Sequence, residues 1–153
     1  MSSSFIPSSG TGPADQAVEN DGWYPDLSVA EMRGATGLGQ IFGAERVAAV
    51  IQAAMIEVNA GIAAWRAQQV AESLDQVPAD SYGGQSAKLL LYKTGVYARA
   101  RAMLLDATRD YDSTKSGHQR ADALEETVDG WLRQSSEALA RLTGRPRTVV
   151  ELI

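Results

Sequence analysis

The sequence of 153 residues predicts an all-α fold, a bundle of three or four helices. Apolar residues recur every three or four positions over long segments, which is the spacing of one helix face. No segment before the last few residues alternates apolar and polar residues as a half-buried strand does. With 44% hydrophobic residues, the chain is long enough for one domain with a modest core.

The first predicted helix is short and runs from Ser28 toward Arg33. Ser28 and Glu31 have the spacing of a capping box, in which two side chains satisfy backbone N–H groups at a helix start. The glycine-rich segment 34–43 that follows is predicted to be a connecting loop. It does not fit a phosphate-binding loop, because its glycine spacing differs, no strand precedes it and no lysine follows.

Two long helices are predicted next. The first runs from Ala44 to about Leu74, and Gly61 inside it costs about 1 kcal/mol relative to alanine. Pro78 and the glycines after it end this segment. The second helix runs from about Ser86 to Tyr111 and is apolar on more than one side. Such a helix is either central in the monomer or also contacts a neighbouring subunit.

The last predicted helix is the most clearly amphipathic segment of the chain. Ser116 and Gln119 give a second capping-box signature at its start. Gly144 suits the position just after the helix, and Pro146 prevents the helix from continuing.

These elements divide the chain into three parts. Residues 1–22 are rich in Ser, Gly, Pro and acids, and we expect a disordered, flexible arm. Residues 23–143 form the helical domain, on which Trp23 and Tyr24 anchor the arm. Residues 144–153 form an extended C-terminal tail with apolar, β-branched residues. A lone strand of this kind is not stable by itself, so it docks either on the chain's own helices or on another protein.

The residue types needed for catalysis are largely missing. The chain has no cysteine and one histidine, His118, which we interpret as an exposed residue at a helix start. The carboxylates of a possible divalent-metal patch, Asp122, Glu125, Glu126 and Asp129, lie on the solvent side of an amphipathic helix, where a solvated face or a subunit contact is favoured over a metal site. The sequence therefore predicts a protein that is not an enzyme and has no cofactor or metal. It shows no secretion signal and no membrane-spanning segment, which indicates a cytosolic protein.

Charge is unevenly distributed along the chain. The net charge of −5 argues against a dedicated nucleic-acid binder. Residues 86–101 nevertheless carry four bases and no acid. We expect these bases to pair with the acidic face of the last helix, in the same chain or in the next subunit, although contact with a DNA backbone stays open. The predicted subunit-contact residues are Lys88, Lys93, Arg99, Arg101, Asp122, Glu126 and Asp129.

Matches to a known family run from residue 23 to residue 153. They include the segments 25–27, 55–60 and 77–80, and Arg66 with Gln68. From Asp112 onward the matching residues are Asp112, Thr114, Gly117, Ala121, Asp122, Thr127, Asp129, Arg133, Ala140, Arg141, Gly144, Pro146, Arg147, Val150 and Ile153. In their order and spacing, the chain resembles the head completion (head stabilisation) proteins of temperate contractile-tailed bacteriophages.

The resemblance implies a small structural virion protein with a head-tail connector-like bundle. Such a protein docks on the portal ring after DNA packaging, completes and stabilises the filled head, and forms the neck for tail attachment. The implied partners are the portal protein, further copies of the chain in a ring of twelve, and a tail or neck terminator protein. Packaged DNA would pass through the channel without sequence-specific binding. The implied location is the virion neck, and the host cytoplasm during assembly.

The resemblance also implies that the C-terminal tail grips the portal. The residues concerned are Gly144, Arg145, Pro146, Arg147, Thr148, Val149, Val150, Glu151, Leu152 and Ile153. Two other functions stay open from the residues themselves. One is a cytosolic helical regulatory adaptor with a C-terminal docking tail, and the other is a DNA-binding regulator that uses the basic segment.

Overall fold

The computed structural model describes residues 15–109 and 117–145, and for residues 117–126 it describes only the backbone. Within these ranges the chain forms five α-helices and two small antiparallel sheets, so the fold is mixed α/β and the prediction of an all-α fold is wrong. The elements are β1 (Ala17–Val18), β2 (Leu27–Ser28), α1 (Val29–Thr36), α2 (Ala44–Gly61), α3 (Ala63–Arg66), a 3-10 turn (Leu74–Gln76), β3 (Ser81–Tyr82), β4 (Gln85–Ser86), α4 (Ala87–Arg109) and α5 (Gly117–Leu142).

The strands were missed because each contains two residues, too few for an alternating pattern. β1 pairs with β2, and β3 pairs with β4. The β3–β4 turn contains Gly83 and Gly84, both with positive φ, at 58° and 78°. A two-residue hairpin turn of this kind needs left-handed backbone at both positions, which glycine adopts without strain.

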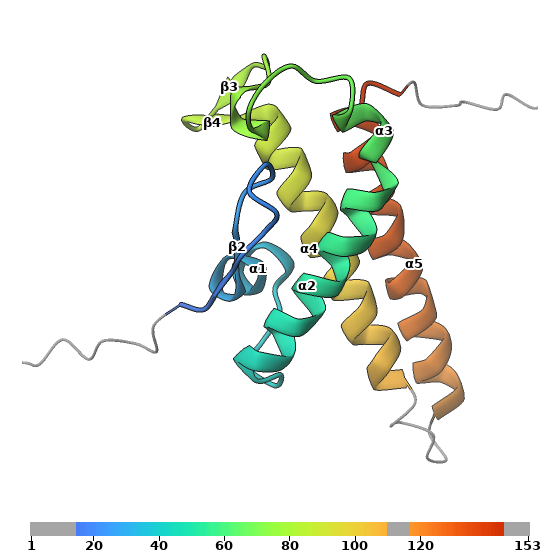
Figure 1. The fold of residues 1–153 in the computed structure, drawn as a ribbon. Helices are drawn as coiled ribbons and strands as arrows, with labels where there is room; N and C mark the ends of the chain where they lie inside the picture. The colour runs from blue at the N-terminus through green and yellow to red at the C-terminus, as the bar shows by residue number, and fades with distance from the viewer. Residues whose placement is uncertain (1–14, 110–116, 146–153) are drawn as a thin grey trace, which may run out of the picture.

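Three long helices, α2, α4 and α5, lie side by side (Figure 1). α4 contacts both α2 and α5, while β1, β2 and α1 form an N-terminal layer that also reaches α4 and α2. Among the described helices, α4 is therefore the central one, which is one of the two roles predicted from its apolar residues on more than one side. Tyr92, Val96, Ala100 and Leu104 of α4 are completely buried.

The packing of α4 against α5 is unusually close at Gly95. A Cβ atom added to Gly95 would lie 2.7 Å from Cδ2 and 2.9 Å from Cγ of Leu139. Next to this contact, the buried hydroxyl of Ser135 donates a hydrogen bond of 2.6 Å to the carbonyl of Gly95. The absence of a side chain at Gly95 therefore lets the two helices approach each other.

α1 begins as its sequence predicted, but only half of the capping box forms. The Ser28 hydroxyl accepts a hydrogen bond of 3.0 Å from the backbone N–H of Glu31. The Glu31 carboxylate does not return to Ser28; it binds Lys93 and Tyr97 of α4 instead. The Ser28 N–H donates to the Tyr97 hydroxyl at 3.2 Å. The start of α1 is thus joined to the central helix.

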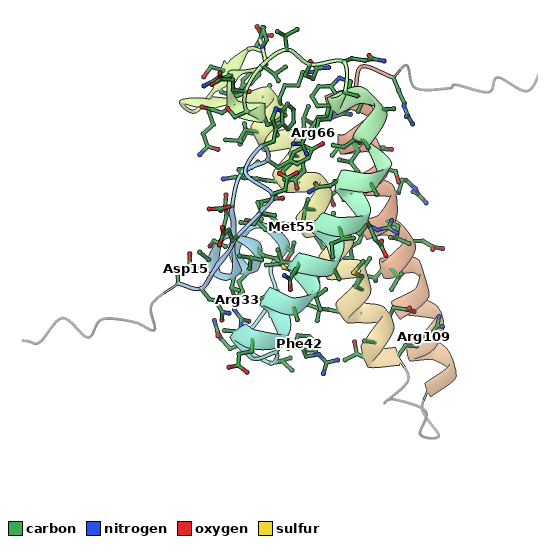
Figure 2. All side chains as sticks on the ribbon, in the orientation of Figure 1. Asp15, Arg33, Phe42, Met55, Arg66 and Arg109 are labelled. Atoms are coloured by element: carbon green, nitrogen blue, oxygen red, sulfur yellow. The ribbon has the colours of Figure 1, made fainter. Side chains whose placement is uncertain are left out.

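The loop between α1 and α2 is held by Arg33. Its guanidinium donates hydrogen bonds of 2.5 Å to the carbonyl of Gly39 and 2.6 Å to the carbonyl of Phe42. Figure 2 shows Arg33 and Phe42 together at this end of the N-terminal layer. The loop occupies residues 37–43 and not 34–43 as predicted, because α1 continues to Thr36.

α2 ends at Gly61, so the prediction of one helix to about Leu74 is wrong. The backbone leaves the α region at Ile62, where φ is −112° and ψ is 15°, and only the short helix α3 follows. The residues after α3 cover the N-terminal segment instead, and Leu74 is completely buried. Tertiary contacts therefore override a local helix pattern, which Gly61 already weakens.

α5 ends as predicted. Gly144 adopts φ of +69°, and its N–H donates to the carbonyl of Arg141 at 3.3 Å. The N–H of Arg145 donates to the carbonyl of Ala140 at 2.9 Å. These two bonds form a Schellman motif, which satisfies carbonyls at the end of a helix. The predicted cap at Ser116 lies outside the described residues.

Candidate functional site

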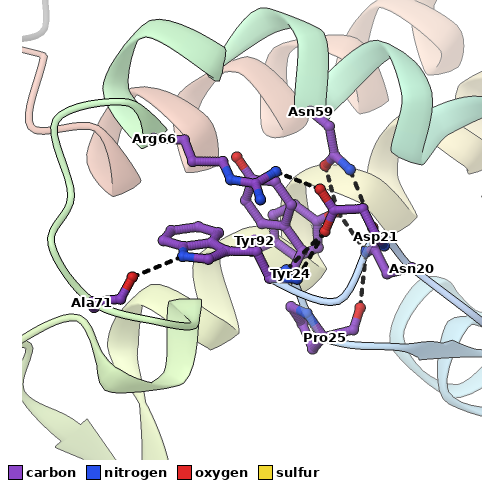
Figure 3. Close-up of polar contacts among 9 residues, drawn as sticks. Asn20, Asp21, Tyr24, Pro25, Asn59, Arg66, Ala71 and Tyr92 are labelled. Atoms are coloured by element: carbon purple, nitrogen blue, oxygen red, sulfur yellow. Dashed lines mark hydrogen bonds and ion pairs between the residues drawn. The ribbon is translucent and has the colours of Figure 1, made fainter.

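A network of polar side chains fixes the N-terminal segment to the helices (Figure 3). The Asn20 amide donates 2.9 Å hydrogen bonds to the Tyr92 hydroxyl and to the Pro25 carbonyl. The Tyr92 hydroxyl donates to the Asn59 side-chain oxygen at 2.7 Å, and the Asn59 amide donates back to Asn20 at 3.1 Å. Asn20, Asn59 and Tyr92 thus close a ring of hydrogen bonds that joins β1–β2, α2 and α4.

Aromatic rings cover this network. Tyr24 stacks on Tyr92 with ring centroids 4.6 Å apart and an angle of 10° between the planes. The indole N–H of Trp23 donates to the Ala71 carbonyl at 3.0 Å. Arg66 lies over both Trp23 and Tyr24 and forms an ion pair with Asp21. The predicted arm falls mostly on residues 1–14, which lie outside the described range, whereas residues 15–22 pack on the domain.

Burial changes the acid–base properties of these groups. Burial raises the pKa of the Tyr24 hydroxyl to about 12, and it also raises the pKa of the Tyr92 hydroxyl. At Asp21, burial raises the pKa, but hydrogen bonds from the N–H groups of Tyr24 and Trp23 and the charge of Arg66 outweigh it, so the pKa is lowered. The contacts of this cluster join the N-terminal segment to α2 and α4.

The four predicted bases lie on one helix, α4, but they have different surroundings. Lys93 pairs with Glu31 at 2.8 Å, and Arg99 pairs with Glu57 of α2. Lys88 donates to the carbonyl of Leu142 at 2.6 Å and lies over the ring of Trp65. Among the described residues, the partners of these three bases are Glu31, Glu57 and the Leu142 carbonyl, and the predicted pairing with the acids of α5 stays a prediction. The Nε atom of Arg101 is buried and has no hydrogen-bond partner among the described residues, and burial lowers the pKa of its guanidinium.

The predicted acids lie on α5. Asp129 is exposed, and the side chains of Asp122 and Glu126 lie outside the described residues. His118 also belongs to the part of α5 whose side chains are not described. In the described parts of the chain, no group of three or more His, Cys, Asp or Glu side chains is arranged to hold a metal ion. None of the helices described there has the length and apolarity needed to span a membrane.

The predicted tail begins at the Schellman motif of α5. Gly144 and Arg145 are exposed, and Pro146 to Ile153 lie outside the described residues. Lys88 holds the end of α5 from the side of α4, since its ammonium binds the Leu142 carbonyl, where the negative end of the helix dipole favours a cation. The base of the tail is therefore fixed to the central helix.

The sequence did not predict a groove between α2 and α5. Two adjoining hollows, of about 300 Å³ and about 150 Å³, share Glu57 and Arg99 in their walls. The larger hollow extends to Thr143 and Arg145 at the end of α5. Small residues on the facing helices, Gly61, Ser136 and Ala140, leave this space open. These small residues are the sequence feature that could have indicated the groove. They lie in two segments that are distant in sequence, so no local pattern links them.

Comparison with known proteins identifies the family. Residues 18–153 match the family of phage head completion proteins (GPL). The chain is 32% identical over 142 residues to the head completion/stabilization protein of Escherichia phage P2, which covers 91% of this chain and 84% of that protein. A comparison with solved structures gives no match. The match over most of the chain confirms the resemblance predicted from the sequence, and this chain belongs to the phage head completion protein family.

Proposed function

We propose that this head completion protein docks on the portal ring after DNA packaging and forms the connector to which the tail attaches. Family membership supports the coarser role, a structural protein that completes the phage head, in a family that is not one of enzymes. Docking on the portal and attachment of the tail through a neck or terminator protein extend that role. We place the protein in the virion neck, and in the host cytoplasm during assembly.

The main support for the proposal is that the end of α5, from which the tail starts, is held in place. The Schellman motif at Gly144 ends α5 on the surface, and Lys88 holds this end against α4. A peptide that leaves from a rigid base loses less entropy when it binds than one that leaves from a mobile base. Residues 144–153, with four apolar side chains among the last five, are the proposed portal-binding segment.

We also propose that the subunits form a ring of twelve through two different surfaces. One is formed by the bases of α4, Lys88, Lys93, Arg99 and Arg101. The other is the charged face of α5, with Asp122, Glu126 and Asp129. A contact between unlike surfaces closes into a ring when the rotation between subunits allows it. Arg101 and the exposed edges of Lys88, Lys93 and Arg99 would then meet carboxylates of the next subunit, and packaged DNA would pass through the central channel without sequence-specific contacts.

Deletion of residues Thr148 to Ile153 tests the portal-binding segment. We expect the shortened chain to keep its helical circular dichroism spectrum and to lose copurification with portal rings. A matched variant, Glu151→Gln, keeps the apolar side chains and should still copurify. Portal binding by the shortened chain would contradict the role of the segment. If the full chain remains a monomer or dimer in the presence of portal rings, the regulatory adaptor becomes the better interpretation.

A further inference from the structure

The groove between α2 and α5 is an open, partly apolar surface on the isolated subunit. The larger hollow lies between α2 and α5, with Arg99 of α4 in its wall. In the smaller hollow α4 contributes Arg99, Ala102, Met103 and Asp106, α5 contributes Val128 and Leu132, and α2 contributes only Glu57. The salt bridge between Arg99 and Glu57 crosses it near the middle, where the two hollows meet. The apolar wall residues are Val58, Ile62, Leu139, Met103, Val128 and Leu132. Apolar surface in contact with water is unfavourable, so a peptide whose apolar side chains cover these walls is stabilised there.

We propose that this groove holds the chain's own residues 146–153 in the isolated subunit. Arg145, the residue from which this segment starts, already lies in the wall of the groove. From Leu142, where α5 ends, back to Val128, the helix rises about 21 Å at 1.5 Å per residue. An extended segment of eight residues spans about 26 Å. The segment therefore has the length needed to follow the groove from one end to the other.

The composition of the segment suits the groove as well. Pro146 cannot continue a helix and favours an extended backbone in the residue before it. Val149, Val150, Leu152 and Ile153 supply apolar side chains for the walls. The remaining charges, on Arg147 and Glu151, would meet the half-exposed charges of Glu57 and Arg99, so neither needs to be buried without a partner.

A segment of the same chain is favoured over a second copy because it is tethered at the groove. A short tether gives an effective concentration in the millimolar range, far above that of free subunits during assembly. The proposal does not depend on portal docking. If both are correct, the segment occupies the groove before assembly and exchanges it for the portal afterwards. Failure of the groove proposal would leave the copurification experiment unaffected.

The absence of cysteine makes a spin-label experiment straightforward. A nitroxide is attached to Ala60→Cys, which is exposed on α2 next to the groove residue Gly61. The ¹⁵N-labelled protein is diluted with excess unlabelled wild type, so that only contacts within one molecule are detected. We expect amide signals of residues 148–153 to lose at least half of their intensity. The matched control, Ala35→Cys on α1, is exposed on the N-terminal layer and should leave these signals unchanged.

Three outcomes would overturn the proposal. The first is unchanged amide intensity in the Ala60-labelled protein. The second is an equal loss when nitroxide and ¹⁵N are on different molecules, which would assign the groove to a second copy. The third concerns Ser136→Arg, which places a large side chain in the groove at an exposed position. This variant should restore the signals, and persistent broadening would show that the segment lies elsewhere.

Discussion

The central helix α4 meets its neighbours in two different ways. Toward α5 the contact is close and depends on side-chain volume, because the absence of a side chain at Gly95 makes room for Leu139. Toward the N-terminal segment the contact depends on hydrogen bonds and stacked rings, with Tyr92 between Asn20, Asn59 and Tyr24. Added side-chain atoms should therefore reduce stability most at the contact between α4 and α5. At the contact between α4 and the N-terminal segment, the loss of a single polar atom should already reduce stability.

Gly95→Val should give the largest effect, because its side chain would overlap Leu139 and separate α4 from α5. We expect a loss of about 3 kcal/mol in the free energy of unfolding, measured by urea denaturation. Gly130→Ala in α5 is the matched control, since a Cβ there meets nothing within 4 Å. It should stabilise the protein by about 0.5–1 kcal/mol, as expected for glycine replacement within a helix. Equal stability of the two variants would refute the close contact.

Two tyrosines test the polar surface. Tyr92→Phe removes a hydroxyl with two asparagine partners and leaves these buried groups unsatisfied, so we expect a loss of about 2 kcal/mol. Tyr24→Phe removes a buried hydroxyl that has no hydrogen-bond partner in the described part of the chain, and should be neutral or stabilising by up to about 1 kcal/mol. Both values come from the same denaturation experiment. A larger loss for Tyr24→Phe than for Tyr92→Phe would contradict the network.

The same tyrosines predict a dependence on alkaline pH. Burial raises the pKa of Tyr24 to about 12, above the value of about 10 in the unfolded chain. The folded state therefore keeps its proton at a pH where the unfolded state loses it, and stability should fall as the pH rises from about 10 to about 12. Tyr24→Phe should show a shallower decline. A parallel decline in both proteins, followed by thermal melting at several pH values, would show that Tyr24 does not contribute.

Two lysines of α4 provide the smallest expected effects. Lys88→Met removes the cation that binds the Leu142 carbonyl and lies over Trp65, and should cost about 1 kcal/mol. Lys93→Met breaks only a partly exposed salt bridge with Glu31 and should cost about 0.5 kcal/mol. Adding salt should reduce the second loss. The order of the two variants in thermal melting checks whether the end of α5 is held from α4.

Local patterns predicted the helices that local interactions determine. The central position of α4, the cap of α1 at Ser28 and the end of α5 at Gly144 all follow from spacing and turn chemistry. The end of α2 could not be predicted in this way, because Trp23 recruits the residues after α3 to cover the N-terminal segment. Partners of the bases also escaped prediction, since Glu31 and Glu57 are distant from them in sequence. The groove depends on two helices at once and has no local pattern.

The hydrogen bond between Asn20 and Tyr92 also has a consequence for synthesis. The two residues are 72 positions apart in the chain. At a rate of 5–20 residues per second, Asn20 is made about 4 to 14 seconds before Tyr92. During that interval Trp23 and Tyr24 are without α4 and expose their rings to solvent and to chaperones. The N-terminal segment is therefore made first among these elements, but it cannot complete its contacts with α4 until that helix has been made.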